Sequence, residues 1–389
     1  MEKTYKYRLY PTKKQVEKLE WTLDICRILY NCALQDRGNC YKETGEGLNL
    51  TKQEAVLKNN KQEYPLLNEI HSQVLQDVLI RVDKAFTNFF RRVRVGEKAG
   101  YPRFKGESRY DSITYPQQPG FSIIPEGLKL SKIGTIKVKF HRPVNGTIKT
   151  CSIKRDVDRW YACFSVEYEP IRPENRLAKA IGIDMGLKSF ATLSNGEIIK
   201  NPEYLRRSEK RLIKKQKVLS RREKGSHNRD KARLIVAKIH RQIRDQRADF
   251  CHKVSHKIVS SFGFIAVEDL SIKNMVKNHH LAKSINDASW GQFLTFLQYK
   301  AEEAGVGFER VVPKDTSIIC SVCGERVPKT LATRIHKCPY CKTILDRDYN
   351  AAINILHKST VGITESYAWG ERSHQDTSLN QEALSFREG

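Results

Sequence analysis

The chain has 389 residues, with 69 Lys and Arg against 44 Asp and Glu, which gives a formal net charge of +25. This excess is far larger than solubility requires and indicates a polyanionic partner such as nucleic acid. The sequence contains no apolar run of about 18 residues and no signal-peptide core at its N-terminus, which excludes membrane-spanning and secreted classes. We therefore expect a soluble cytoplasmic protein, built from two to four folding units.

The first predicted elements are a strand and two helices. Tyr5–Tyr10 alternates apolar and basic residues and stops at Pro11, which predicts a strand with one basic face. A capping box at residues 12–15 opens the first helix. Apolar residues that step by three or four predict another helix from Leu67 to Val93.

Three phenylalanines on the second helix, Phe86, Phe89 and Phe90, admit two interpretations. Their rings could stack on nucleobases. An aromatic stripe at helical spacing is more often core, however, and we interpret it as core here. A basic and aromatic turn at residues 100–106 then leaves the helices.

A small β-domain is predicted next. Residues 135–140, 147–154 and 160–168 alternate with a period of two and indicate strands, the first pair joined by a turn at Asn145-Gly146. The N-terminal strand has the same alternating basic character. We therefore predict that it joins this sheet, with Tyr7 beside a strand of the 135–168 region.

The second half begins with a buried-type strand at 180–184 and its hairpin partner at 190–194. A long helical stretch follows, in which Arg206 to Arg247 holds 17 Lys and Arg but only 4 Asp and Glu. Such a stretch is typical of a nucleic-acid footprint, although a solvated basic helix pair without a ligand is the alternative. The polar segment from Lys358 onward predicts a disordered tail.

Two acidic residues end predicted strands. Asp184 lies between Gly182 and Gly186, which would let a phosphate backbone approach closely, although an Asp in such a turn can equally be structural. Glu268 ends the apolar run 264–267, where a charge must be solvated, paired or metal-bound. Asp269 points to the opposite side of the strand, and we interpret it as a capping residue for the segment that starts at Ser271.

Asp346 and Asp348 precede a short amphipathic helix, and each could simply be a first-turn acid favoured by the helix dipole. Together with Asp184 and Glu268, one of them can complete a three-carboxylate site. Such a cluster needs Mg²⁺ or Mn²⁺, because unpaired like charges in a cleft are costly. On a basic chain it indicates two-metal hydrolysis of a phosphodiester. Lys188, Arg347 and Asn350 are candidates for phosphate or supporting contacts.

Four cysteines have the spacing of a zinc site: Cys320, Cys323, Cys338 and Cys341. Two C-x2-C pairs separated by 14 residues supply the thiolates that tetrahedral Zn²⁺ requires. Because four thiolates close the coordination sphere, the metal should be structural. The six other cysteines are scattered along the sequence, unlike the closely spaced cysteines of disulfide-rich domains, and are interpreted as reduced.

With these motifs in one order, the chain resembles the transposon-encoded TnpB (OrfB) family of compact RNA-guided DNA endonucleases, which are related to type V CRISPR effectors. The resemblance covers roughly residues 1–358 and is carried by residues 5–12, 182–186, 267–270, the cysteine quartet and 346–352. It implies a multidomain α+β and α/β protein with a RuvC-like RNase H fold, a zinc-binding insertion, a β-barrel wedge domain and a helical recognition insertion.

The resemblance also implies domain boundaries. They are 1–10 and 113–175 for the wedge, 11–112 for the helical recognition domain, 176–315 and 344–358 for the RuvC-like nuclease, 316–343 for a zinc-binding target nucleic-acid-binding module, and 359–389 for the tail.

The implied activity is Mg²⁺-dependent cleavage of double-stranded target DNA beside a short flanking motif, directed by a guide RNA from the transposon end. The catalytic acids fall on Asp184, Glu268 and Asp348, with Asp346 as the alternative for the last. We expect a monomer with RNA, no membrane, and a prokaryotic cell interior. Polar residues of the second helix, such as Gln73, Gln76 and Asp77, are candidates for the flanking motif. The alternatives are a nuclease-inactive RNA-guided repressor and a DNA transposase or recombinase of RNase H fold.

Overall fold

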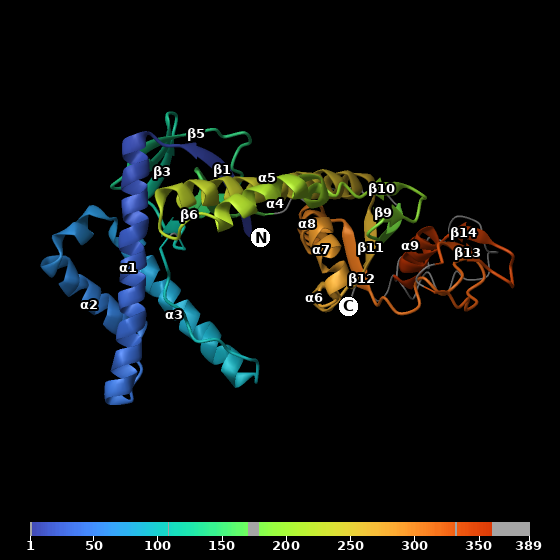
Figure 1. Cartoon of the computed structure of the whole chain (residues 1–389), viewed down its shortest axis with the longest axis horizontal. Coiled ribbons are helices and arrows are strands. Elements are labelled where there is room, and N and C mark those ends of the chain that lie inside the picture. The colour runs from blue at the N-terminus through green and yellow to red at the C-terminus, as the bar shows by residue number, and fades with distance from the viewer. Residues whose placement is uncertain (1, 108, 170–178, 331–332, 360–389) are drawn as a thin grey trace. The chain divides into compact units, whose positions relative to one another are not determined.

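The computed structural model describes residues 2–107, 109–169, 179–330 and 333–359. The chain divides into two compact units, Met1–Glu169 and Pro170–Gly389 (Figure 1). Across these described ranges, no helix is both long and apolar enough to cross a membrane. The predicted disordered tail lies outside the described residues except for Lys358, which is wrongly included because it is the last residue of helix α9 (Arg347–Lys358), and Ser359.

The first unit contains a seven-stranded antiparallel sheet in the order β2-β6-β7-β1-β5-β4-β3. Its strands are β1 (Glu2–Tyr10), β2 (Ser112–Tyr115), β3 (Phe121–Ile124), β4 (Gly127–Leu130), β5 (Gly134–Val138), β6 (Thr147–Asp156) and β7 (Arg159–Glu167). β1 is central because its alternate residues Tyr5, Tyr7 and Leu9 are buried. Tyr7 pairs with Ala162 of β7, so the predicted entry of the N-terminal strand into this sheet is confirmed.

The predicted hairpin between residues 135–140 and 147–154 is wrong. β5 pairs with β1 and β4, whereas β6 pairs with β7 and β2. A Cβ on Gly146, whose φ is +109°, would lie 2.4 Å from the Glu167 carbonyl oxygen. The Asn145-Gly146 segment therefore packs against the end of β7 instead of closing a hairpin.

The helices of the first unit are α1 (Lys13–Thr44), α2 (Leu50–Glu63) and α3 (Ser72–Arg94), with a 3-10 turn η1 (Pro65–Glu69) before α3. Thr12 and Gln15 form the predicted capping box of α1. The predicted second helix is interrupted, because Ile70 is extended and separates η1 from α3. The buried Arg37 joins the three helices, since its Nε donates to Gln53 at 2.7 Å and its Nη2 to Asp83 at 2.9 Å.

The phenylalanine stripe on α3 is only partly core. Phe86 is buried, Phe89 is half-buried, and Phe90 is 56% exposed. The expectation that all three rings belong to the core is therefore wrong for Phe90. Phe86 is the last buried residue of the helix, which continues to Arg94.

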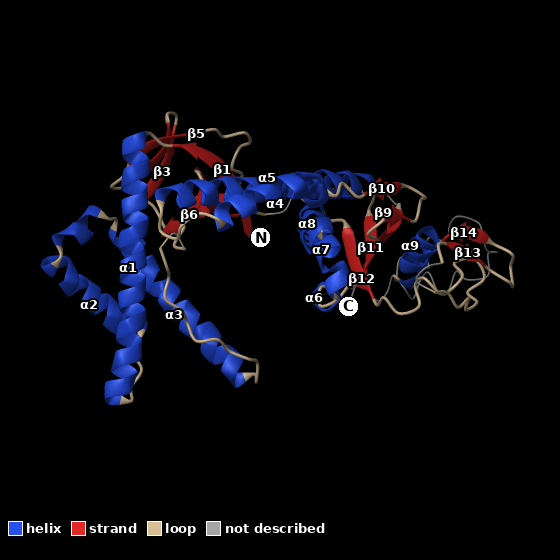
Figure 2. Cartoon of the chain, in the orientation of Figure 1, coloured by secondary structure: helices blue, strands red, loops and turns tan. Residues whose placement is uncertain are grey.

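The second unit contains a five-stranded mixed sheet in the order β10-β9-β8-β11-β12 (Figure 2). Its strands are β8 (Ala180–Met185), β9 (Ser189–Leu193), β10 (Ile198–Lys200), β11 (Phe264–Glu268) and β12 (Gly307–Val311). β8, β11 and β12 are parallel, while β9 and β10 continue as antiparallel hairpins from β8. The predicted strand at 180–184 and its hairpin partner are confirmed.

Helices cover both faces of this sheet. The helices of this unit are α4 (Tyr204–Ser220), α5 (His227–Ser261), α6 (Ile272–Met275), α7 (His279–Ala288), α8 (Trp290–Ala304) and α9 (Arg347–Lys358). Ile183 of β8 and Val267 of β11 pack with residues of α5 and α8 in one core. Ala266 packs with Ile355 of α9 on the opposite face, and Figure 1 shows α8 and α9 on the two sides of β11.

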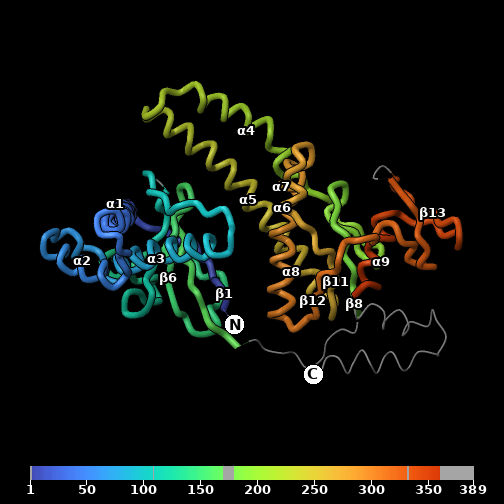
Figure 3. The backbone as a smooth tube through the Cα atoms, turned by 90° about the horizontal axis from the view of Figure 1, so that it is seen from below, coloured from blue at the N-terminus to red at the C-terminus, as the bar shows by residue number. Residues whose placement is uncertain are grey.

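The basic stretch forms a helical pair, in which α4 and α5 run side by side (Figure 3). Leu212 of α4 and Val236, Ile239 and Ile243 of α5 form a small core between them. Most Lys and Arg side chains of the pair are exposed, whereas Arg241 is buried and the C-terminal part of α5 packs in the core of the sheet. The structure therefore confirms the predicted helices and places most of their positive charge at the surface.

Candidate functional site

Strand alternation brings Asp184 and Glu268 to the same face of the sheet. In the parallel pair β8 and β11, Ile183 is opposite Val267, so the next residue along each strand is one of the two acids. Since side chains alternate between faces, both acids point away from the α5–α8 core and toward α9. Glu268 is 8% exposed, and Asp184 is half-buried.

Helix α9 carries the third acid to the same place. It packs so closely on β8 that a Cβ on Gly182 would lie 2.1 Å from the Ala352 carbonyl oxygen. A Cβ on Gly186 would lie 4.0 Å from Asp348 Oδ2, which places this carboxylate beside the loop that follows β8. Gly182 therefore serves the approach of α9, whereas the sequence had suggested approach of a phosphate backbone.

The carboxylates repel one another through space. The pKa of Asp184 is raised well above 3.8, first by burial and then by the negative charges of Glu268 and Asp348, while Arg347 opposes the shift. Burial also raises the pKa of Glu268 above 4.5, against the hydrogen bond from Thr316 and the charge of Lys358. Two buried carboxyls with raised pKa values at one sheet edge mark a place where a cation would favour their charged forms.

Asp346 and Asp348 have different surroundings. Asp346 is the N-cap of α9, because its Oδ1 accepts from the backbone N–H of Asp348 at 2.8 Å and of Tyr349 at 3.2 Å. The Asp348 side chain is 16% exposed and is held by Arg347 at 3.0 Å and by Arg334 at 3.8 Å. The helix therefore uses Asp346 for its own backbone and presents Asp348 toward Asp184.

The chemistry of this donor set suits a hard divalent cation, for which carboxylate oxygens are the preferred ligands. Within the described ranges, the four cysteines are the one group of His, Cys, Asp and Glu whose ligand atoms all lie within 4.8 Å of one another. The oxygens of the three carboxylates are thus not all within 4.8 Å of one another.

Asp269 has a different role from the one predicted. Its backbone N–H donates to Val311, and its carboxylate lies 3.6 Å from Arg310 Nη1. The short helix α6 has Ser271 as its N-cap, without a side-chain cap hydrogen bond. The expectation that Asp269 caps this segment is therefore wrong, because the adjacent strand β12 supplies a cationic partner.

The four cysteine thiols lie together, as their spacing predicted. Sγ of Cys320 is 3.6 Å from Sγ of Cys341, and Sγ of Cys323 is 3.5 Å from Sγ of Cys338. Zn–S bonds of about 2.3 Å place tetrahedral sulfurs about 3.8 Å apart, whereas a disulfide would need about 2.05 Å. The separations therefore fit four thiolates around one Zn²⁺.

The two cysteine pairs have the same turn. Gly324 and Lys342, which follow the second cysteine of each pair, both have positive φ values, +78° and +61°. Their N–H groups donate to the carbonyl oxygens of Cys320 and Cys338 at 2.9 and 3.1 Å. A hydrogen bond from Thr343 lowers the pKa of Cys341 to about 6, which favours the thiolate that a metal needs.

Two asparagines of α9 attach this cysteine module to the acidic site. Buried Asn350 donates to the Ile319 carbonyl oxygen at 2.8 Å and accepts from the Ser321 N–H at 3.0 Å. One turn later, Asn354 donates to the carbonyl oxygens of Thr316 and Ile319 at 2.8 and 2.7 Å. Asn350 therefore supports the module from within, and its buried amide is no phosphate contact.

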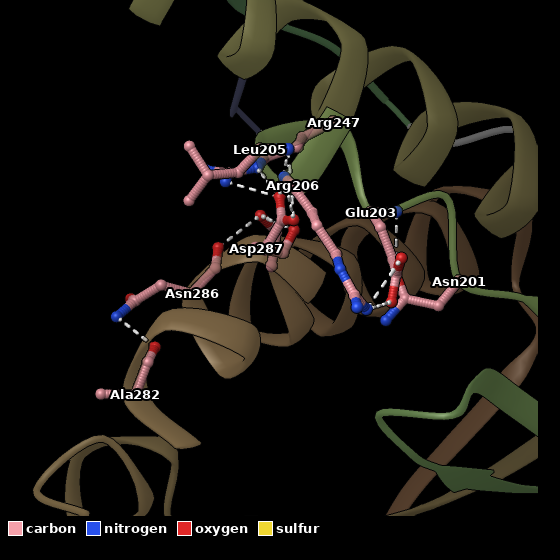
Figure 4. Close-up of polar contacts among 9 residues, drawn as sticks. Asn201, Glu203, Leu205, Arg206, Arg247, Ala282, Asn286 and Asp287 are labelled. Carbon is pink, nitrogen blue, oxygen red and sulfur yellow. Dashed lines mark hydrogen bonds and ion pairs between the residues drawn. The ribbon is translucent and has the colours of Figure 1, made fainter. Parts of the chain in front are cut away.

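A polar cluster that the sequence did not predict joins the N-terminus of α4 to α5 and α7. The carboxylate of Asp287 in α7 accepts from Leu205 N–H at 3.0 Å and from Arg247 Nη2 at 2.6 Å (Figure 4). Glu203 precedes α4 with φ +48° and gives no side-chain cap, so Asp287 supplies the acceptor from another helix. A cavity of about 340 Å³ lies beside this cluster and is also lined by Lys188 of the loop after β8.

Substitution Asp287→Ala is expected to lower the free energy of unfolding by about 2–4 kcal/mol, because it leaves Arg247 and the first N–H groups of α4 without their acceptor. The Asp287 and Arg247 side chains are only 9% and 20% exposed. Urea denaturation measures the loss. Asp245→Ala, which removes an exposed pair with Arg244, is the matched control and should cost less than about 1 kcal/mol. Equal losses in the two variants would contradict the role given to Asp287.

The stability of the protein without added Mg²⁺ should depend on pH through Asp184. Because the folded-state pKa of Asp184 is raised above 3.8, the folded chain binds more protons than the unfolded chain above that pH. The free energy of unfolding of the protein should therefore fall as the pH rises from 3.8 through the raised pKa of Asp184. Asp184→Asn should remove this part of the slope and be more stable than the wild type at pH 7. Denaturation curves across this range, with exposed Asp249→Asn as control, test it; parallel curves for all three proteins would contradict it.

Comparison with known proteins adds family membership to this geometry. Residues 163–279 match the family OrfB_IS605, described as "Probable transposase", and residues 290–355 match the "Cas12f1-like, TNB domain". Residues 1–46 match a "Helix-turn-helix domain", although here they form β1 and the single long helix α1.

Full-length relatives extend this match. The chain is 35% identical over 366 residues to a "Putative RNA-guided DNA endonuclease" of Streptomyces pristinaespiralis, covering 92% of this chain and 89% of the relative. It is 28% identical to the "Putative RNA-guided DNA endonuclease InsQ" of Escherichia coli K12, covering 90% and 91%. A solved structure of the mini-RNA-guided endonuclease CRISPR-Cas_phi3 aligns at a TM-score of 0.48 and 10% identity, over 93% of this chain and 92% of that one. On the strength of the identity shared with the Streptomyces protein along nearly all of both sequences, the chain belongs to the TnpB (OrfB) family.

Proposed function

We propose that this chain is an RNA-guided DNA endonuclease of transposon origin, which cuts target DNA beside a short flanking motif. The observation that carries the proposal is the meeting of Asp184, Glu268 and Asp348 on one face of the sheet, where the charges of Glu268 and Asp348 add to burial in raising the pKa of Asp184. The names of the full-length relatives and the net charge of +25 support a nucleic-acid substrate. The complete acid set argues against a nuclease-inactive repressor.

The nuclease domain, 176–315 with 344–358, has a RuvC-like RNase H fold in this proposal. The five-stranded order, with the hairpin strands on one side of β8 and the parallel strands on the other, supports it. Residues 1–10 with 113–175 form the wedge barrel, and 11–112 form the helical recognition domain. Tyr115 of the edge strand β2 donates to the Ser131 carbonyl oxygen after β4, which supports a sheet curled toward closure.

Asp184, Glu268 and Asp348 would hold the two Mg²⁺ ions, which when bound supply water activation and stabilisation of the leaving 3′ oxygen. Thr316 donates to Glu268 and fixes the direction of that carboxylate. Arg347 and Arg334 contact Asp348 and offer positive charge to a scissile phosphate lying against the acids. The N-cap role of Asp346 favours Asp348 as the third ligand.

The cysteine quartet would hold structural Zn²⁺ and form the target nucleic-acid-binding module, 316–343. The basic pair α4 and α5 would bind phosphates of the guide or the target through counterion release. Gln73, Gln76 and Asp77 at the start of α3 stay candidates for the flanking motif. In this proposal the protein acts as a monomer with its RNA.

RNA dependence tests the proposal. The chain is purified with the RNA it carries, the RNA is sequenced, and a plasmid library holding the complementary target beside randomised flanks is offered with Mg²⁺. We expect loss of plasmids with one flanking motif, and no loss after RNase treatment of the protein. Guided binding without cutting would support the repressor instead, and cutting without RNA would support a transposase or recombinase.

A further inference from the structure

Four aromatic rings meet where α3 leaves the core of the first unit. Phe86 lies 6.2 Å from Phe90 in a stacked arrangement, and its ring edge meets Tyr101 at 5.5 Å. Phe89 contacts Phe90 at 5.2 Å and Tyr101 at 5.5 Å, both edge to face. Phe86 is the buried member, whereas Phe90 and Tyr101 are 56% and 53% exposed. The cluster thus has an anchored base and an open aromatic face.

The open face is held in place from two sides. Beneath it, Arg37 lies 5.2 Å from the Phe86 ring centre and is itself fixed by Gln53 and Asp83. The segment that carries Tyr101 is tied to α1, because Asn31 accepts from the Lys105 N–H at 2.8 Å and donates to the Lys105 carbonyl oxygen at 3.0 Å. A ring surface held this way loses little conformational entropy when a ligand covers it.

The surroundings are strongly basic. Residues 86–105 contain six Lys and Arg and a single acidic residue, Glu97. Among the described side chains, Arg92 lies 3.8 Å from Glu97, a weak and exposed pair. The cationic residues are Arg91, Arg92, Arg94, Lys98, Arg103 and Lys105. An exposed aromatic face inside a surface with six cations and one acid matches a nucleobase with flanking phosphates.

We propose that Phe90 and Tyr101 form a stacking platform for an unpaired base of the RNA that the chain carries, with Arg91 and Arg94 on its phosphates. This inference rests on the proposed function for the presence of RNA. RNA is favoured over the target because proteins recognise RNA mainly at single-stranded loops, bulges and ends whose bases are splayed onto aromatic side chains. The target DNA arrives as a duplex, and its bases become unpaired only after the guide has opened it.

Ultraviolet cross-linking of the purified RNA complex tests the assignment directly. Zero-length cross-links form where a ring touches a base, so nucleotide adducts are expected on tryptic peptides 85–91 and 99–103. Adducts that occur elsewhere but never on these two peptides would contradict the stacking platform and leave the proposed function intact. A wild-type preparation without any discrete RNA would overturn both the platform and the proposed function.

Affinity for the sequenced RNA, resynthesised, provides the second measurement. Phe90→Ala should weaken binding about tenfold, since one base–aromatic stack is worth about one decade or more. The ratio of the Phe90→Ala affinity to that of the wild type should persist when salt is raised, whereas the defect of the double variant Arg91→Gln, Arg94→Gln should shrink.

Phe90→Trp should bind like the wild type. Tyr41→Ala removes a 65% exposed ring from α1 and should change nothing. Equal RNA affinities of Phe90→Ala and Tyr41→Ala would overturn the proposal. It would also be overturned if Phe90→Ala changed only dimerisation, or only the binding of single-stranded DNA.

Discussion

Substitution Asp184→Asn is expected to lower DNA cleavage at least about a thousandfold, because the metal site supplies several kcal/mol of transition-state stabilisation. The side chain keeps its shape but loses the charge that faces Glu268 and Asp348. Single-turnover cleavage of a matched target measures the loss. Guide RNA and target binding should persist, since the basic helices α4 and α5 are untouched.

Two carboxylates at the start of α9 supply a matched pair of controls. Asp348→Asn should behave like Asp184→Asn. Asp346→Asn keeps an N-cap acceptor, and even Asp346→Ala should cost only about 1 kcal/mol of stability and leave cleavage within a few fold. Loss of cleavage in Asp346→Asn with retention in Asp348→Asn would reverse the assignment of the third acid.

Removal of zinc is expected to unfold the cysteine module and abolish cleavage. Structural zinc sites of this kind contribute on the order of 10 kcal/mol at neutral pH, and among the described residues of the module Val327 is the buried apolar side chain besides its cysteines. Unfolding of the module should also displace Asp348, because Asn350 and Asn354 of the same helix bind the backbone of residues 316–321. Cys338→Ser should therefore expose the module to limited proteolysis and bind less than one zinc per chain.

The control for this experiment is Cys32→Ser, which changes an exposed thiol outside the module. It should keep one zinc per chain and full cleavage. Undiminished cleavage by Cys338→Ser at normal protein stability would show that the module and the acidic site are independent. Metal content by atomic absorption separates that outcome from incomplete removal of zinc.

The features predicted best from the sequence are those set by local periodicity. Apolar runs that end in Asp184 and Glu268 identify buried strands, and alternation then decides which face each acid occupies. The C-x2-C spacing is likewise local, because each pair closes its own turn at Gly324 or Lys342. The site residues themselves stay predictions until the variants above are measured.

The features missed depend on partners distant in sequence. An alternation of apolar and polar residues identifies a strand but not its partner in the sheet. The sequence therefore predicts that β5 pairs with β6, although β1 and β7 lie between them. Asp287 stabilises α4 across 82 positions, which no local pattern reveals. Phe90 fits the helical stripe perfectly well by spacing, yet the core ends one turn before it.

The most direct test of the central claim is to reprogram the guide. The RNA that copurifies with the chain is resynthesised with a new guide segment, and cleavage is mapped on one plasmid that carries both the old and the new target beside the same flanking motif. We predict that the wild type cuts only at the new target and that Asp184→Asn, loaded with the same RNA, binds there without cutting. Cutting that stays at the old target, or that persists in Asp184→Asn, would contradict an RNA-guided nuclease built on these carboxylates.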